Sequence, residues 1–187
     1  RPLSHCGNWS FIQGLPFGRL VGVGSDARAT LGVPRALREE ISAVLPGREL
    51  EGLLVVVTTQ RSDLDLVNTG EAVDAEKDAL LERFFVWAQA AAAALAAAGH
   101  WCDYVDPCSG LLMVDRSGHR SVYDEVSALA ALRRYKTSNA GCCKIVLHPR
   151  WGSSVYPATL FTDAPPDALA GALQAAEAAL QPPGPPT

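Results

Sequence analysis

Residues 74–99 read DAEKDALLERFFVWAQAAAAALAAAG, and this stretch predicts the longest helix of the chain. Asp74 is a suitable N-cap residue, and Glu76 and Asp78 place negative charge in the first turn, where the helix dipole favours it. Apolar residues then recur at helical spacing until Gly99 ends the pattern: Leu80, Leu81, Phe84, Phe85, Ala88, Ala91, Ala92 and Leu95. The pattern predicts an amphipathic helix that buries one side in the core of a globular domain.

The same stretch argues against insertion into a membrane. Its weakly polar part, residues 84–98, is shorter than the ~20 residues that cross a bilayer. It also contains Gln89 and continues a charged segment. We therefore expect no membrane-spanning segment here.

The elements on either side of this helix decide the fold class. Residues 53–59 are apolar on both alternating faces until Thr58 and Thr59, which predicts a central strand covered on both sides. Two hairpins are expected, one from residues 100–105 and 110–114 and one from residues 142–147 and 154–161. Further helices are expected at residues 35–44, 124–135 and 167–180. Hairpins with helices between them are typical of an α+β domain with a largely antiparallel sheet and flanking helices.

Length and charge predict one domain in 187 residues. The expected parts are an irregular N-terminal arm at 1–33, the α+β domain at 34–180 and a disordered Pro-rich tail at 181–187. A net charge of −4 without a basic face makes nucleic acid an unexpected partner. Because the chain begins with Arg1, we expect a processed fragment whose targeting peptide is not visible.

The five cysteines, an odd number without regular spacing, favour a reducing compartment. The loop at Gly22 and Gly24 lacks the other residues of a phosphate-binding motif, so it is interpreted as an ordinary loop. Zinc is not expected either, because there is no C-x-x-C pair and adjacent strand residues point to opposite faces.

Cys142 is the candidate reactive thiol. Strand alternation groups Cys143, Ile145 and Leu147 on one apolar face, which places Cys143 in the core. The other face then carries Cys142, Lys144, Val146 and His148. A nearby ammonium such as Lys144 can lower the pKa of a thiol. Catalysis by a cysteine with His148 or His100 stays open, although a buried cysteine that acts as a small hydrophobe is commoner.

Two motifs carry a resemblance to a known family. Residues 99–110 read GHWCDYVDPCSG and residues 141–148 read GCCKIVLH. Both, in this order, closely resemble the CblD family, the methylmalonic aciduria and homocystinuria type D proteins. The similarity extends over about residues 35–170, whereas Cys102 and Cys108 depart from the family pattern.

The resemblance implies a cobalamin (vitamin B12) trafficking adaptor, or metallochaperone, with a nitroreductase-like α+β fold but without FMN or an enzymatic reaction of its own. It implies a complex with the cobalamin-processing protein CblC and delivery of cofactor to methionine synthase in the cytoplasm and methylmalonyl-CoA mutase in the mitochondrion. It further implies that Cys142 offers a thiolate to the cobalt of cobalamin. Lys144, as a nearby ammonium, is expected to tune that thiolate. For the partner surface we interpret Trp151, Arg133, Arg134 and Lys136 as candidates, because aromatic residues and Arg are enriched in binding hot spots.

Two other functions remain open from the sequence. One is a thiol-dependent oxidoreductase or hydrolase that uses Cys142 with His148. The other is an interaction module in which every cysteine is structural.

Overall fold

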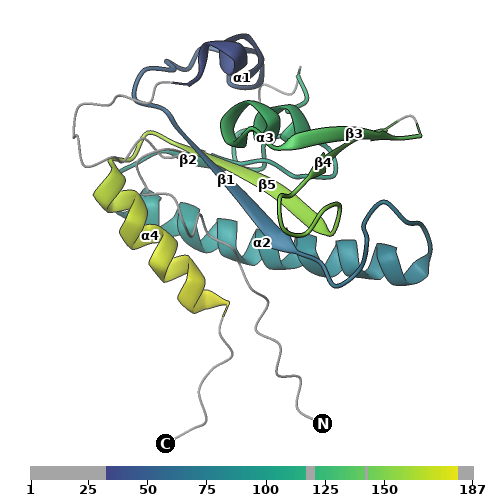
Figure 1. Cartoon of the computed structure of the whole chain (residues 1–187). Helices are drawn as coiled ribbons and strands as arrows, with labels where there is room; N and C mark the ends of the chain where they lie inside the picture. The colour runs from purple at the N-terminus through teal and green to yellow at the C-terminus, as the bar shows by residue number, and fades with distance from the viewer. Residues whose placement is uncertain (1–32, 117–120, 142, 181–187) are drawn as a thin grey trace, which may run out of the picture.

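A three-stranded antiparallel sheet with the strand order β1-β5-β2 lies at the centre of the molecule (Figure 1). The computed structural model describes residues 33–116, 121–141 and 143–180. The middle strand, β5 (Val155–Thr162), pairs along its full length with β1 (Leu54–Arg61). On its other side β5 pairs with the short strand β2 (Cys102–Tyr104). The predicted antiparallel α+β class is confirmed, and the nitroreductase-like arrangement is compatible with it.

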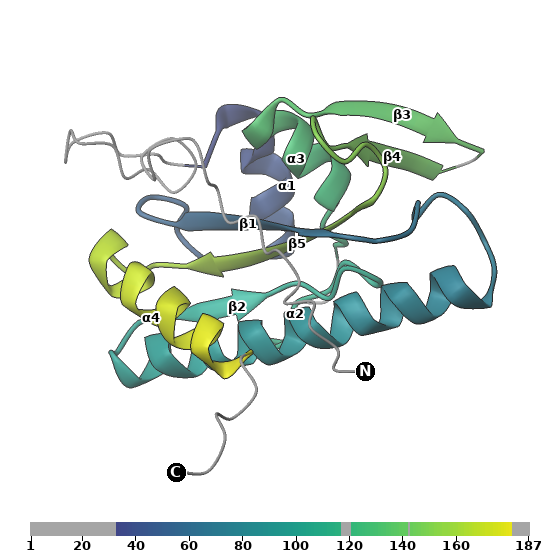
Figure 2. The ribbon, with the colours of Figure 1, turned by 60° about the horizontal axis from the view of Figure 1, so that its bottom comes forward.

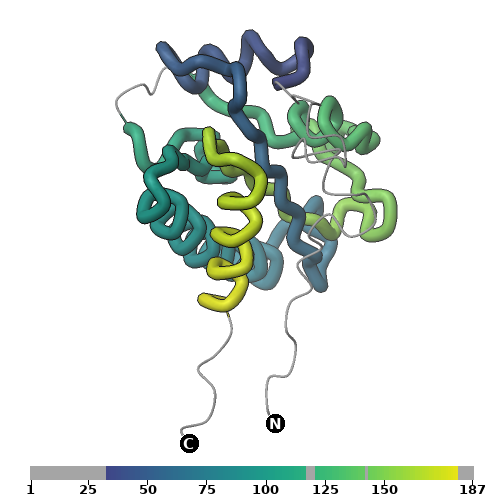
Figure 3. The backbone as a smooth tube through the Cα atoms, turned by 90° about the vertical axis from the view of Figure 1, so that its left-hand side faces the viewer, coloured from purple at the N-terminus to yellow at the C-terminus, as the bar shows by residue number. Residues whose placement is uncertain are grey.

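Helices cover both faces of this sheet (Figure 2). On one face lie α2 (Glu71–Ala97) and α4 (Pro166–Ala179), which pack along each other (Figure 3). On the other face lie η2 (Arg35–Leu37), α1 (Arg38–Val44) and α3 (Glu125–Arg133). That face also carries a separate two-stranded sheet, formed by β3 (Lys136–Ala140) and β4 (Cys143–Leu147).

Each face of the sheet has its own core, as strand alternation requires. Val56 and Leu160 point toward α2 and α4, whereas Val55 and Phe161 point toward α1 and α3. This explains why residues 53–57 are apolar throughout. Their predicted position was wrong, because β1 is an edge strand and β5 is central. An apolar pattern on both faces indicates that other elements pack on both faces of the strand. It does not indicate how many strands pair with it.

The N-cap of helix α2 lies four residues before Asp74, the predicted N-cap. Gly70, with a φ of 126°, occupies the N-cap position, and its carbonyl accepts hydrogen bonds from the N–H groups of Val73 and Asp74. Among the described residues α2 is the one helix long and apolar enough to cross a membrane by length and composition, with a mean hydropathy of 1.3 over its most apolar 18-residue window. Its buried side nevertheless packs against the sheet and α4, as in the core helix of a globular domain.

The predicted hairpin of residues 142–147 with residues 154–161 was wrong. β4 pairs with β3, and β5 belongs to the central sheet. The bridge between His148 and Gly152 closes a tight loop that carries the chain from one sheet to the other. The predicted arm, the Gly22 and Gly24 loop and the Pro-rich tail lie outside the described residues, apart from Val33, which is buried.

Candidate functional site

The predicted reactive cysteine belongs to the β3–β4 hairpin, which projects from the body of the molecule (Figure 2). Ala140 pairs with Cys143, so only Gly141 and Cys142 separate the two strands. Gly141 has a φ of 62°, which is the left-handed backbone that short hairpin turns require. Cys142 lies outside the described residues, but both of its neighbours, Gly141 and Cys143, are exposed.

The side of the hairpin that faces the body is the opposite of the predicted one. Val146 is buried at 5% exposure and joins the core under α3, and His148, just beyond the strand, is buried as well. Cys143 is exposed, whereas Ile145 and Leu147 are half-buried. The predicted core position of Cys143 was therefore wrong, because α3 covers the face that carries Val146.

Lys144 connects the hairpin to the first turn of α3. Its Nζ donates a hydrogen bond to the Ser127 hydroxyl over 3.3 Å, and that hydroxyl donates to the Asp124 carboxylate over 2.5 Å. Burial alone would raise the pKa of Asp124. Hydrogen bonds from Ser127 and from the backbone N–H groups of Ser127 and Val126, together with the charge of Lys144, outweigh burial and lower that pKa. Tuning of Cys142 by Lys144 stays a prediction.

His148 lies at the other end of β4 from the turn. It is five positions along the chain from Cys143, which corresponds to about 17 Å in an extended strand. Its Nδ1 accepts hydrogen bonds from the N–H groups of Arg150 and Trp151, both over 3.2 Å, which leaves the ring proton on Nε2. The ring stacks on Trp151 at 3.9 Å and meets Tyr135 edge-on at 5.2 Å. Burial, followed by the charges of Arg133 and Arg150, lowers the pKa of His148. These contacts describe a neutral histidine that stabilises the loop.

The other described thiols differ in accessibility. Cys102 is buried in β2, and burial, reinforced by the carboxylates of Asp103 and Asp163, raises its pKa to about 12. It is therefore protonated at neutral pH. Cys108 is exposed, and its Sγ lies 3.6 Å from the Tyr156 hydroxyl. In the described part of the chain no group of three or more His, Cys, Asp or Glu residues could hold a metal ion.

The motif at residues 99–110 contains a buried carboxylate with a structural role. The buried Asp103 carboxylate accepts hydrogen bonds of 2.7–3.2 Å from the backbone N–H groups of four residues: Tyr104, Met113, Val114 and Asp115. These bonds hold residues 113–115 against the edge of β2 and thereby cover it. The role of Asp103 was not predicted, although an acidic residue inside an apolar strand is the signal that could have revealed it. Gly110 has a φ of 71°, and a side chain there would collide with Val122.

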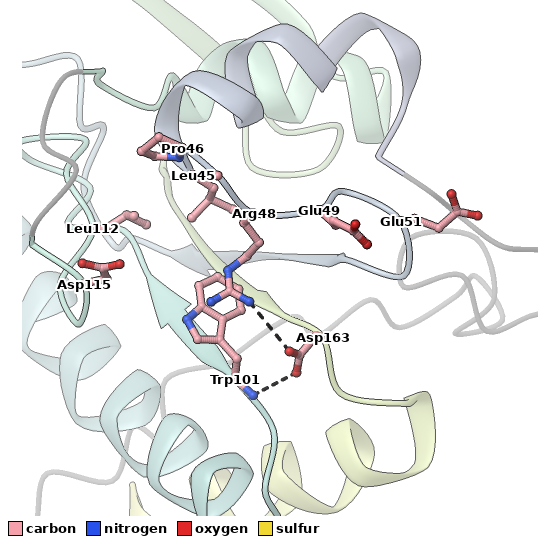
Figure 4. Close-up of a pocket in the computed structure, with 10 residues that line it drawn as sticks. Leu45, Pro46, Arg48, Glu49, Glu51, Trp101, Leu112, Asp115 and Asp163 are labelled. Atoms are coloured by element: carbon pink, nitrogen blue, oxygen red, sulfur yellow. Dashed lines mark hydrogen bonds and ion pairs between the residues drawn. The ribbon is translucent and has the colours of Figure 1, made fainter.

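A cavity of about 490 Å³ lies between the α1–β1 connection and the start of β2 (Figure 4). The Arg48 guanidinium lies 3.6 Å from the centre of the Trp101 ring and 3.8 Å from the Asp163 carboxylate. The Asp163 carboxylate also accepts a hydrogen bond from the backbone N–H of Trp101 over 2.8 Å, so Asp163 holds both Arg48 and Trp101 in place. None of the residues that line this cavity belongs to the hairpin.

A family model described as "Methylmalonic aciduria and homocystinuria type D protein" matches residues 27–173, a range that contains both the 99–110 motif and the hairpin. The chain belongs to this family. Relatives named "Cobalamin trafficking protein CblD" in Rattus norvegicus and Homo sapiens are each 31% identical to it over 134 residues. These residues are 72% of this chain and 45% of each relative. The Gallus gallus protein of the same name is 28% identical over the same coverage. The resemblance to the CblD family is thus confirmed, and the chain spans about half the length of these relatives.

Proposed function

We propose that this chain is a non-enzymatic adaptor in cobalamin trafficking that presents the Cys142 thiolate to the cobalt of a cobalamin held by a CblC-like partner. Membership of the CblD family implies the role in trafficking. The observation that supports the finer proposal is the exposed hairpin, in which Gly141 and Cys143 on either side of Cys142 are open to solvent. A corrin ring is large, and a projecting turn can approach it where a recessed thiol could not.

The chemistry fits a cysteine at this place. The thiol releases its proton to solvent, and the resulting thiolate donates an electron pair to cobalt as a soft ligand. Cys102 is unsuited to this step because it is buried and its pKa is about 12. The cobalamin is cargo in this proposal, so the chain itself needs no enclosed corrin pocket.

The enzymatic alternative receives no support from the geometry around the hairpin. A thiol-dependent oxidoreductase or hydrolase needs a base within hydrogen-bond reach of its nucleophile. His148 lies at the far end of β4, and its Nδ1 is occupied by two backbone donors. Delivery of the cofactor to methionine synthase and methylmalonyl-CoA mutase, in the cytoplasm and the mitochondrion, is part of the same proposal.

Absorbance titration of cobalamin with a purified CblC-like protein, with and without this chain, tests the proposal. The wild-type chain should produce a sulfur-to-cobalt absorption band, and Cys142→Ser should abolish it because an alcohol cannot replace a soft thiolate. Cys143→Ser is the matched control, and it should retain the band. A band that survives Cys142→Ser and disappears with Cys143→Ser would move the ligand by one residue. A band in none of the proteins would reject cobalt ligation by this chain.

A further inference from the structure

The face of the β3–β4 hairpin that points away from the body carries a row of apolar side chains. Cys143, Ile145 and Leu147 alternate along β4 on this face, and the pairing places Lys136 directly opposite Leu147. Ile145 and Leu147 are only half-buried, and among the described side chains they belong to neither core cluster. An apolar alternation of this kind is typical of a buried strand face, yet here the body covers the other face.

Positively charged side chains lie at the base of the hairpin. Residues 126–162 contain five Lys and Arg residues and no Asp or Glu, in a chain whose net charge is −4. Arg134, Lys136 and Arg150 are exposed at the base of the hairpin. None of these three forms an ion pair with any part of the chain that the structure describes. The hairpin is therefore a cationic lobe on an acidic molecule.

Arg134 adds an independent observation. It has a φ of 54° at the C-cap of α3, which is a left-handed backbone that a glycine would adopt with less strain. Strain of this kind costs about 1 kcal/mol or more and recurs at functional positions. An exposed arginine at such a position points to a role for its charge.

We propose that the outer face of the β3–β4 hairpin is the docking surface for a partner protein with an acidic rim. Ile145 and Leu147 form the apolar centre of this surface, and Arg134, Lys136 and Arg150 form its cationic border. The proposal deepens the proposed function, on which it rests, because it assigns to the CblC-like partner the face adjoining the turn that contains Cys142.

The positive charge of this surface favours an acidic partner protein over a second copy of the chain or either of its termini. A second copy of the chain docked through the same face would bring two cationic lobes together, which is unfavourable. Residues 1–32 contain three Arg and one Asp, and residues 181–187 contain no charged side chain, so neither terminus complements the surface. An acidic protein surface complements both the apolar centre and the cationic border.

The apolar centre is tested with the double variant Ile145→Thr/Leu147→Thr. Threonine is β-branched and therefore suits a strand, so both substitutions remove apolar surface while the strand is retained. Its affinity for a purified CblC-like protein, measured by calorimetry without cobalamin, should fall by roughly tenfold or more, as expected when an apolar centre of an interface is replaced. Val86→Thr is the matched control, because Val86 is 43% exposed on α2, on the opposite face of the central sheet. It should bind like the wild type.

The cationic border is tested separately, which keeps the proposal falsifiable if the double variant does not fold. Lys136→Glu should slow association with the CblC-like protein and weaken the dependence of that rate on salt, since rim charges act mainly on the association rate. Lys77→Glu introduces the same charge change in α2, which lies on the opposite face of the central sheet from the hairpin (Figure 2). It should leave the association rate nearly unchanged.

The outcomes separate this proposal from the proposed function. If the wild-type chain does not bind the CblC-like protein, the proposed function fails. If it binds, and both the folded double variant and Lys136→Glu bind equally well, the docking surface is wrong while the function stands. Binding of the wild-type chain to vesicles rich in phosphatidylserine, lost in Lys136→Glu while CblC binding persists, would assign the surface to a membrane and overturn the protein partner.

Discussion

Val146 makes the apolar contact by which the β3–β4 hairpin joins the body of the molecule. Its side chain is 5% exposed and lies in the same core cluster as Leu129 of α3 and Tyr135. On the same face, Lys144 holds the hairpin to the start of α3 through Ser127. The attachment thus combines one buried apolar residue with one polar contact.

This attachment predicts that substitutions at Val146 and Cys143 change the free energy of unfolding by different amounts. Val146→Ala should lower the free energy of unfolding by roughly 1–3 kcal/mol, because it removes two buried methyl groups and leaves a cavity. Cys143→Ser should change it by less than about 0.5 kcal/mol, as is usual for an exposed position. Chemical denaturation of the two variants and the wild type measures both values. A larger loss for Cys143→Ser than for Val146→Ala would show that the hairpin faces the other way.

The sequence predicted that residues 142–147 form a strand, but it did not show which side of that strand is buried. Both alternating sets of β4 contain apolar residues, and the set with more of them, Cys143, Ile145 and Leu147, is the outer one. Only α3, which packs over Val146, decides the buried side. Long-range packing of this kind leaves no local signature in the sequence.

At the scale of elements, α2 shows how far a periodic pattern reaches. The predicted stripe contained Phe84 and Leu95, which are fully buried, together with Leu81 and Phe85, which are half-buried. It omitted Trp87, which is fully buried. The stripe is therefore rotated slightly toward Trp87, because α2 packs against α4 as well as against the sheet.

Because the buried side of α2 includes Phe84 but only part of Leu81, truncating these two side chains should lower the free energy of unfolding by different amounts. Phe84→Ala should lower the free energy of unfolding by roughly 3–5 kcal/mol, because the ring is fully buried and contacts Trp87 and Tyr104. Leu81→Ala should cost clearly less, since solvent already reaches that side chain. Urea denaturation of both variants tests the order, and equal losses would place Leu81 in the core as well.

Strand β3 could not be predicted because nothing in KTSNA, residues 136–140, alternates in polarity. All of these residues are exposed or half-buried, so the strand exists through its pairing with β4 and the turn at Gly141. A strand that buries no face gives no hydrophobic pattern. Of the hairpin that carries the candidate site, the sequence therefore predicted β4 but not β3.

At the scale of the whole molecule, a buried polar contact joins the layer of α3 to the central sheet. The Thr159 hydroxyl on β5 donates a 2.5 Å hydrogen bond to the carboxyl group of Glu125 in the first turn of α3. The second oxygen of Glu125 is buried without a hydrogen-bond partner among the described residues. Burial, and to a smaller extent the nearby carboxylates of Asp124 and Glu40, outweigh the opposing effect of the hydrogen bonds with Thr159 and raise the pKa of Glu125 to about 8. Glu125 is thus mainly protonated at neutral pH.

This raised pKa predicts how the stability of the molecule depends on pH. The folded chain retains the Glu125 proton up to about pH 8, whereas the unfolded chain releases it near its usual pKa of 4.5. Because the folded state binds the extra proton in this window, its contribution to the free energy of unfolding is complete below pH 4.5 and falls as pH rises to about 8. The slope from this one proton is at most about 1.4 kcal/mol per pH unit.

Comparison with Glu125→Gln isolates this slope from other titrations. His148, whose pKa is lowered on folding, contributes a slope of opposite sign just below its usual pKa of 6.5, but it does so in both proteins. The difference in unfolding free energy, variant minus wild type, should therefore rise steadily between pH 5 and about pH 8 and become constant above it. The side-chain amide oxygen in this variant still accepts a hydrogen bond from Thr159, so α3 should remain seated on β5, as circular dichroism would show. A difference that stays flat across this window would mean that Glu125 is ionised in the folded protein.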